Sequence, residues 1–481
     1  MTTGSKPATG PAKWLNDNDQ ERRWALSTFG SPKGREVTGE ISVSPLPVAI
    51  PLQPASLPRR LDSAEAFFWF LDHVSAMNFA VIAEGCGDLD DEVLRAALDQ
   101  AQQAHPLLRA GITANAEQRL IWFPVPDQPL TYTVIETGLD WQTPLAEAMV
   151  QSFPLDSAPL VRMLRLNRDG GRWTVALIFH HSAGDGRSGC RLLADILVSA
   201  AHPERPVSPH PGYPPIHELY PVDYTSAAAA EHFKAQRKEE LQRYGQFDEL
   251  PGFNRHAPTT QPRFQTLRVE PDQLNQLADR CRAAGTTLHG VISAAQLLAL
   301  HRAFGDEQPH TLGLTTPADL RGYLREPLDD ASPLLGATLV TSVYRLPAEF
   351  WTLARAVSSD LKRQMQRGDG FLFFSLFPPP AEFPANPEGI AAFTRMMAIA
   401  PQVSMVSNVG RLAPLSATTP FQVEAFSFAL CPMNSHVLFT AVGTFNNRMT
   451  LNVNFDAARL PPEQAMPIIA DLEAALIRAA E

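Results

Sequence analysis

The chain has 481 residues, more than one hydrophobic core normally accommodates, so two core domains are expected. Hydrophobic residues make up 44% and charged residues 19% of it, which is ordinary for a globular protein. The formal net charge of -11 disfavours nucleic acid as a partner, because non-specific binding to a polyanion needs clustered positive charge.

Cysteine usage and hydropathy indicate a reducing compartment. Cys86, Cys190, Cys281 and Cys431 lie far apart, without zinc-ligand spacing or the pattern of a disulfide scaffold, and are expected to be reduced thiols. Residues 1–14 contain no secretory apolar segment, and no apolar run approaches about 18 residues. We therefore expect no membrane span and a cytoplasmic location.

After a polar arm, the first part of the chain alternates between helical and strand-like patterns. Residues 1–57 are rich in Gly, Pro, Ser and Thr and predict an extended or disordered arm, in which only 40–50 resembles a strand. Asp62 or Ser63 is expected to cap the first helix and Asp88 the second. Periodicity predicts helices at 64–71, 89–104, 141–151 and 190–201, and strands at 78–84, 107–112, 120–125, 130–135, 160–166 and 173–179.

A proline-rich stretch separates the two halves. Residues 202–221 contain seven prolines, too many for a regular element. We place a linker at 203–226 between an N-terminal subdomain, 58–202, and a C-terminal subdomain, 227–481. Charged sequence within 227–244 predicts two helices. The other expected elements are helices at 271–284, 287–303, 350–366 and 461–480, strands at 264–269, 311–316, 337–344, 404–408, 421–430, 436–445 and 449–455, and a tight turn at Asn446-Asn447. The segment 370–380 is expected to be an apolar loop, with the edge of a tunnel as the alternative.

A short motif concentrates chemistry at the end of a buried strand. The apolar run 173–179 is followed by His180, His181, Asp185 and Gly186. A neutral imidazole takes a proton from a hydroxyl or amine near neutral pH. Consecutive strand residues point to opposite faces, so one histidine is the candidate base and the other is structural. Asp185 would orient a histidine, bind a metal or pair with an arginine, and Gly186 leaves room for a substrate.

From the residues alone, several interpretations stay open. A metal site needs a third ligand, and His-His-x-x-x-Asp is not by itself a convincing ligand spacing. A serine hydrolase needs a Gly-x-Ser-x-Gly elbow, which Gly186-Arg187-Ser188-Gly189 does not supply. Structural coincidence is a further alternative. A histidine general base without a covalent nucleophile fits the motif best.

Over residues 58–481 the chain resembles the superfamily of condensation domains and chloramphenicol-acetyltransferase-like acyltransferases. Residues 180–186 match the family's His-His-x-x-x-Asp-Gly signature. The other matching landmarks, in order, are His105-Pro106-Leu107-Leu108-Arg109, Phe153-Pro154-Leu155-Asp156, Pro159-Leu160-Val161-Arg162, Ala318-Asp319-Leu320-Arg321, Ser407-Asn408-Val409-Gly410 and Leu451-Asn452-Val453-Asn454-Phe455-Asp456.

The resemblance implies a fold and roles for the motif residues. The expected fold is α/β, with two chloramphenicol-acetyltransferase-like domains in a V-shaped pseudo-dimer and a tunnel between them. His181 is expected to be the catalytic general base and His180 to support the local structure. Asp185 is expected to pair with Arg321 and brace the loop.

The same resemblance suggests where a developing oxyanion would be stabilised. Backbone N–H groups near Gly186 are the first candidates. Ser407 and Asn408 are weaker candidates for an oxyanion or tunnel position. No metal and no cofactor are expected beyond the phosphopantetheine or coenzyme A that carries a substrate thioester.

The implied activity is that of a free-standing acyltransferase of specialised metabolism, in polyketide or nonribosomal peptide biosynthesis. An acyl or peptidyl carrier protein would deliver the acyl thioester, and a hydroxyl or, as a second choice, an amine would accept the group. An alcohol acyltransferase that uses acyl-coenzyme A is the alternative enzyme. A catalytically silent recruitment domain is the alternative of another class, which intact His181 and Gly186 disfavour. A monomer is expected.

Overall fold

The computed structural model describes residues 57–125, 128–205, 207–375, 379–415 and 419–481. The arm expected at 1–57, except for its last residue, and the strand expected at 40–50 lie outside these residues. The helices are α2 (Ser63–Asp72), α3 (Asp91–Ala104), α4 (Gln142–Met149), α5 (Gly186–Ala201), α6 (Val222–Thr225), α7 (Ala227–Tyr244), α8 (Pro271–Ala284), α9 (Leu288–Arg302), α10 (Phe350–Arg367), α11 (Asp369–Leu372), α12 (Pro387–Ala398) and α13 (Pro462–Ala480). The strands are β1 (Arg59–Arg60), β2 (Phe79–Gly87), β3 (Ala110–Ala114), β4 (Leu120–Pro124), β5 (Thr131–Glu136), β6 (Val161–Arg168), β7 (Arg172–Phe179), β8 (Pro262–Val269), β9 (His310–Asp319), β10 (Ala337–Leu346), β11 (Val403–Arg411), β12 (Phe421–Leu430), β13 (His436–Phe445) and β14 (Arg448–Asp456).

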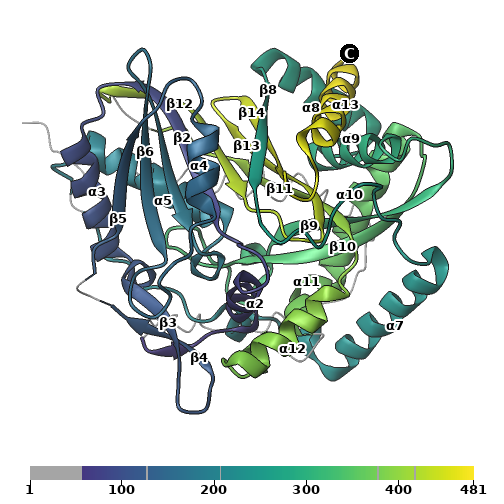
Figure 1. Cartoon of the computed structure of the whole chain (residues 1–481), viewed down its shortest axis with the longest axis horizontal. Coiled ribbons are helices and arrows are strands. Elements are labelled where there is room, and N and C mark those ends of the chain that lie inside the picture. The colour runs from purple at the N-terminus through teal and green to yellow at the C-terminus, as the bar shows by residue number, and fades with distance from the viewer. Residues whose placement is uncertain (1–56, 126–127, 206, 376–378, 416–418) are drawn as a thin grey trace, which may run out of the picture. The chain divides into compact units, whose positions relative to one another are not determined.

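A five-stranded sheet carries the histidine motif. Its order is β12-β2-β7-β6-β5, so β7 is the central strand. Figure 1 labels the other four strands of this sheet, β12, β2, β6 and β5. Every residue of β7 after Arg172 is buried, as predicted for a strand covered on both faces. Helix α5 packs on β2 and β7, and α3 packs on α5. The motif therefore follows the best-covered strand of this sheet.

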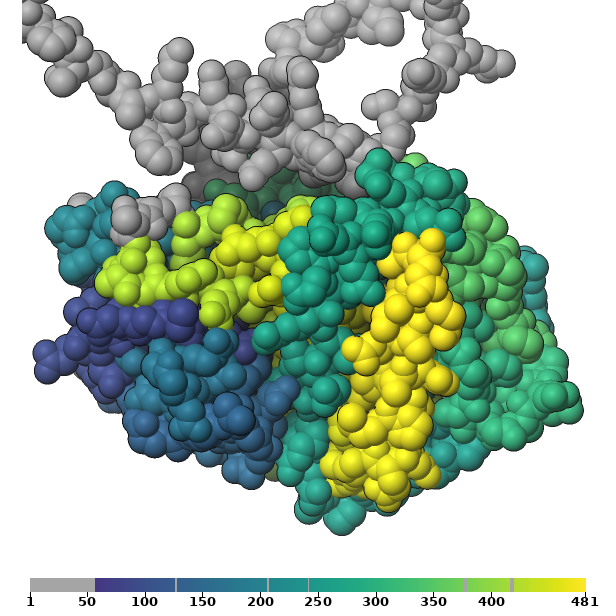
Figure 2. All heavy atoms as spheres, turned by 90° about the horizontal axis from the view of Figure 1, so that it is seen from above, coloured from purple at the N-terminus to yellow at the C-terminus, as the bar shows by residue number. Residues whose placement is uncertain are grey.

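A six-stranded sheet has the order β10-β9-β11-β13-β14-β8. Strands β9, β11 and β13 run parallel to one another, and the pairs β10–β9, β13–β14 and β14–β8 are antiparallel. Asn446 and Asn447 join β13 to β14 with φ of 47° and 57°, which confirms the predicted tight turn. Helix α13 packs on α8 and α9, and Figure 2 shows α13 in yellow at the surface.

One strand crosses between the two halves of the sequence. Strand β12 pairs antiparallel with β2 in the five-stranded sheet, although the neighbouring strands in sequence, β11 and β13, belong to the six-stranded sheet. A further, three-stranded sheet has the order β1-β4-β3. The fold is α/β, as predicted. The division into subdomains 58–202 and 227–481 stays a prediction.

The N-terminal ends of two early helices show how capping decides their start. Asp62 caps α2, because its carboxylate accepts from the Glu65 N–H while the Glu65 carboxylate accepts from the Asp62 N–H. The Asp88 cap was wrong. Asp90 caps α3 instead, accepting from the N–H groups of Glu92 and Val93.

Three further expectations were wrong in their bounds. The strand expected at 107–112 begins at Ala110, because Pro106–Arg109 forms a 3-10 helix. Residues 227–244 form the single helix α7 rather than two helices. The helix expected at 190–201 begins at Gly186. Helix α12, which has Pro387 in its first turn and an Asn386 cap, was not predicted.

Within the part of the chain that the structure describes, no single helix is both long and apolar enough to cross a membrane. Helices α8 and α9 meet the length and composition test only as a pair, and they are bent by 94° at the break between them.

Candidate active site

The two motif histidines face different surroundings because the strand ends before them. Strand β7 ends at Phe179, and the His180 N–H donates to the Leu160 carbonyl at 3.0 Å. His181 then begins a 3-10 helix that runs to Ala183. The Ser182 hydroxyl donates to the Glu65 carbonyl of α2 at 2.7 Å, which ties this turn to that helix. The predicted separation of the two rings is present, but a turn rather than strand alternation produces it.

The His181 ring is held between aromatic neighbours. It stacks on Phe68 with ring centroids 3.9 Å apart and planes inclined by 13°, and Phe79 lies tilted against it at 4.8 Å. His181 Nδ1 lies 3.1 Å from the Gly184 carbonyl oxygen. Because a carbonyl only accepts, the proton of the neutral ring is on Nδ1 and the lone pair is on Nε2. Burial lowers the pKa of His181 to about 4, so the ring is neutral near pH 7.

His180 has a structural environment. Its side chain is buried, and Nδ1 accepts from the Ser182 N–H at 3.2 Å. Its Nε2 lies 3.8 Å from Asp72 Oδ2, and Phe153 meets the ring edge-on. Burial lowers the pKa of His180 to about 4, although the Asp72 carboxylate opposes this shift. His180 does not line the cavity that His181 lines.

Asp185, near the end of the histidine motif, forms a buried, bidentate ion pair with Arg321. Arg321 Nη1 lies 3.0 Å from Asp185 Oδ2, and Nη2 donates to Oδ1 at 3.2 Å. The two side chains are 5% and 3% exposed. Arg321 also donates to Asp319 Oδ1 at 3.0 Å and to the Leu334 carbonyl at 3.1 Å. The guanidinium therefore bridges the motif and the end of β9.

The remaining contacts of Asp185 fix it in an anionic, non-reactive state. Asp185 caps α5 by accepting from the Ser188 N–H at 3.0 Å, and its other oxygen accepts from the Gly336 N–H at 2.8 Å. Burial alone would raise the pKa of Asp185, but Arg321 and these hydrogen bonds hold it below its usual value. Neither carboxylate oxygen is left free for proton transfer. Among the described residues, no group of three or more His, Cys, Asp or Glu side chains is arranged to hold a metal ion.

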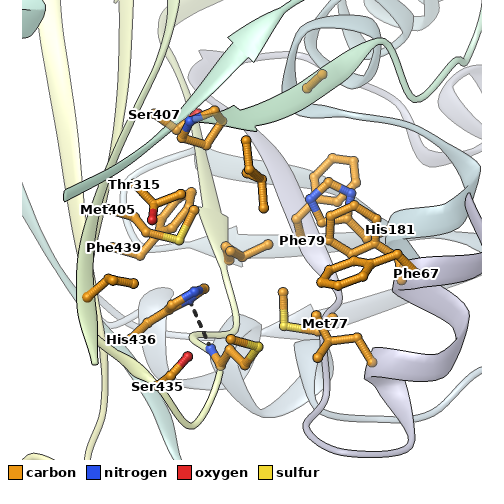
Figure 3. A pocket seen from close by; sticks show the side chains of 18 of the residues that line it. Phe67, Met77, Phe79, His181, Thr315, Met405, Ser407, Ser435, His436 and Phe439 are labelled. Atoms are coloured by element: carbon orange, nitrogen blue, oxygen red, sulfur yellow. Dashed lines mark hydrogen bonds between the residues drawn. The ribbon is translucent and has the colours of Figure 1, made fainter. Parts of the chain in front are cut away.

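A mostly apolar cavity of about 200 Å³ lies in front of His181. Both large sheets and α2 contribute to its wall. In Figure 3, His181, Phe67 and Phe79 lie on one side of the cavity and Thr315, Met405 and His436 on the other. The aromatic residues Phe373 and Phe374, from the segment 370–380, also line it.

The three remaining predicted site residues have different positions. Gly186 lines the cavity, and a Cβ there would lie 3.2 Å from Val409 and 3.5 Å from Phe428, so this close packing favours glycine. Ser407 also lines the cavity, from β11. Asn408 does not line it. Its side-chain oxygen accepts from the Gly410 N–H at 2.8 Å, which satisfies a local turn.

Four features of the site were missed by sequence reasoning. The helix predicted at 64–71 was given no role in the site, although its Phe68 covers the candidate base. Asp319 stood in a quoted landmark, two residues before Arg321, and its spacing was the available signal. Ser435 and His436 line the far side of the cavity. A lone histidine at the start of an apolar strand carries no signal of such a position.

The chain belongs to the condensation-domain family. The family model described as Condensation domain matches residues 67–315. A second model, described as Phthiocerol/phthiodiolone dimycocerosyl transferase C-terminus, matches residues 258–453.

Particular relatives are similar in sequence or in structure. Over 232 residues the chain is 26% identical to Tyrocidine synthase 3 of Brevibacillus parabrevis, a match that covers 46% of this chain and 3% of that protein. The trichothecene 15-O-acetyltransferase from Fusarium sporotrichioides superposes with a TM-score of 0.68 at 14% identity, covering 92% of this chain and all (100%) of that one. Polyketide synthase associated protein 5 from Mycobacterium tuberculosis gives a TM-score of 0.60 at 16% identity, covering 87% and 98%. The two structural matches show a shared fold.

Proposed function

We propose that the protein is an acyltransferase that moves an acyl group from a thioester to a hydroxyl acceptor, with His181 as general base. The observation that carries the proposal is the state of this imidazole. Its Nδ1–H is donated to the Gly184 carbonyl, and Nε2 is the nitrogen left for the cavity. A pKa of about 4 keeps Nε2 unprotonated near pH 7. An amine is the alternative acceptor.

The proposed reaction needs no covalent enzyme intermediate. The acceptor hydroxyl gives its proton to His181 Nε2 while its oxygen attacks the thioester carbonyl carbon. The tetrahedral intermediate collapses, the C–S bond breaks, and the imidazolium returns its proton to the leaving thiolate. Helix α5 begins at Gly186, and the first N–H groups of a helix have no partner within the helix, which supports them as oxyanion donors.

Asp185 and Arg321 act as positioning residues in this proposal. Their ion pair and the α5 cap restrain the turn from His181 to Gly186, so the base and the oxyanion donors keep one geometry. Phe68 and Ser182 restrain the same turn from the α2 side.

The proposed donor is an acyl thioester on the phosphopantetheine of a carrier protein, in polyketide or nonribosomal peptide biosynthesis. Family membership and the likeness to Tyrocidine synthase 3 support this setting. The match covers only 3% of that synthase, and the carrier protein is proposed as the partner that delivers the acyl group.

A mass-spectrometric assay tests the proposal. The same acyl group is offered on a carrier protein and on coenzyme A together with a panel of alcohols and amines, and acylated product is measured. His181→Ala should reduce turnover by about 10² to 10⁴. His301→Ala is the matched control, because His301 is a buried histidine of α9 that does not line the cavity.

Each outcome of this assay bears on one part of the proposal. Near-normal turnover in a folded His181→Ala protein contradicts the assigned base. Preference for coenzyme A contradicts the carrier-protein donor and favours an alcohol acyltransferase. Binding of the carrier protein without product from any thioester favours a silent recruitment domain.

A further inference from the structure

The far wall of the mostly apolar His181 cavity carries two neighbouring polar residues, in addition to Thr315, Thr341 and Ser407. Ser435 ends the loop between β12 and β13, and His436 is the first residue of β13. Both line the same cavity as His181, and Figure 3 shows them on the side opposite that residue. The proposed reaction uses neither side chain.

His436 presents a fixed hydrogen-bond donor. Its Nδ1 accepts from the Met433 N–H at 3.3 Å, so the proton of the neutral ring is on Nε2. Burial lowers the pKa of His436 to about 3, which keeps the ring neutral. Among the described residues, no protein group accepts a hydrogen bond from Nε2.

Ser435 adds a hydroxyl that has no hydrogen-bond partner among the described residues. The residue is 1% exposed, and its Oγ is buried with no hydrogen bond in the described part of the chain. A buried hydroxyl without a partner is unfavourable, and native proteins satisfy most such groups. Two consecutive residues that line the cavity thus each carry a polar group without a partner among the described residues, which is the arrangement expected of a site that a ligand completes.

We propose that Ser435 and His436 form a polar subsite that binds a neutral oxygen, a ketone carbonyl or a hydroxyl, on the acyl chain that the cavity holds. The inference rests on the proposed acyl transfer for the identity of that chain.

The residues that line the cavity favour an aliphatic acyl chain and a neutral rather than a charged oxygen. Among the described residues, no Lys or Arg lines the cavity, and Asp185, which does line it, has its carboxylate paired with Arg321. A carboxylate on the ligand would therefore be buried without a cation, which is costly. Four methionines are among the lining residues, Met77, Met397, Met405 and Met433, and their flexible side chains suit an aliphatic chain.

Binding measurements test the subsite separately from catalysis. The probes are the octanoyl thioester of N-acetylcysteamine and its 3-oxo, 5-oxo and 7-oxo derivatives, which are isomers of one another, titrated calorimetrically into the full-length His181→Ala protein. One ketone isomer should bind about tenfold more tightly than the plain chain, the gain from hydrogen bonds that plain octanoyl cannot make. Equal affinity for all four probes overturns the inference.

Substitutions test whether Ser435 and His436 cause the tighter binding of one ketone isomer. His436→Phe, added to His181→Ala, should remove it, Ser435→Ala should reduce it, and His436→Gln, which keeps an N–H donor, should restore part of it. Met405→Leu is the matched control, because it alters the cavity wall without removing a donor and should leave the ratio of affinities unchanged. A preference that survives His436→Phe overturns the assignment. If His436→Phe does not fold, the comparison of the four probes in the His181→Ala protein still shows whether the subsite exists.

Turnover of the same probes by the unsubstituted protein distinguishes the two proposals. Tight binding of one ketone isomer without transfer to any acceptor contradicts the proposed function and leaves the subsite intact. Transfer of all four acyl groups with equal kcat/KM, together with equal binding, supports the proposed function and contradicts the subsite.

Discussion

Replacing Arg321 by Ala should destabilise the protein strongly, because it leaves the Asp185 carboxylate buried without its cation. Asp185 would keep the hydrogen bonds from the N–H groups of Ser188 and Gly336 but lose both guanidinium contacts, at 3.0 and 3.2 Å. Breaking a buried ion pair by removing one partner costs about 3 to 5 kcal/mol. We expect a loss of free energy of unfolding in that range.

Urea unfolding followed by tryptophan fluorescence measures this loss, since Trp122 and Trp173 are buried at 0% and 1% exposure and report on the core. Arg187→Ala is the matched control. Arg187 also contacts Asp319, at 3.3 Å, but its side chain is 49% exposed, so its removal should cost less than about 1 kcal/mol. Equal losses for Arg321→Ala and Arg187→Ala would refute the reasoning.

A second substitution separates charge from shape. Asp185→Asn in the Arg321→Ala protein removes the uncompensated charge, so the double variant should be more stable than Arg321→Ala alone. Arg321→Lys keeps the charge but not the two-pronged geometry, and should fall between Arg321→Ala and the unsubstituted protein. If the double variant is no more stable than Arg321→Ala, the unpaired carboxylate is not the source of the loss.

The remaining predictions concern the pKa of His181. The kcat/KM of acyl transfer should stay constant from pH 7 down to about 5 and fall near pH 4, because protonation removes the base and burial lowers its pKa to about 4. A fall in kcat/KM centred near the ordinary histidine pKa of 6.5 would contradict a buried base. Phe68→Ala uncovers the face of the His181 ring, whose centroid now lies 3.9 Å from that of Phe68, and admits water. The pKa of His181, and with it the pH at which kcat/KM falls, should therefore rise. If kcat/KM falls at the same pH in the Phe68→Ala protein, Phe68 does not shield His181.

Features coded by neighbouring residues could be predicted from the sequence. The buried strand β7 follows from an unbroken apolar run, and the β13–β14 turn follows from Asn446-Asn447, whose side chains tolerate positive φ. Boundaries were harder, because several residues compete for one cap. Asp88 and Asp90 are both suitable helix caps, and only the structure shows that Asp90 accepts the hydrogen bonds from the first turn of α3.

Features that depend on distant segments could not be predicted from residue patterns. Helix α5 begins at Gly186 because Asp185, already held by Arg321, caps it, and no local apolar period marks that start. The far wall of the cavity depends on the pairing of β9, β11 and β13, so His436 had no local signal. The Asp185–Arg321 pair was predicted through the family resemblance, since the two residues are 136 positions apart.

The same contacts place the base and the far wall in one rigid frame. Arg321 joins the motif to the end of β9, β9 pairs with β11 through Val403, and Val403 pairs with His436 at the start of β13. The separation between His181 and His436 is therefore set by an ion pair and strand registers rather than by mobile side chains. A fixed separation allows a hydrogen-bonding group to recognise an oxygen at only one position along an extended chain. A single preferred ketone isomer, rather than a general preference for polar chains, is thus the result that this frame requires.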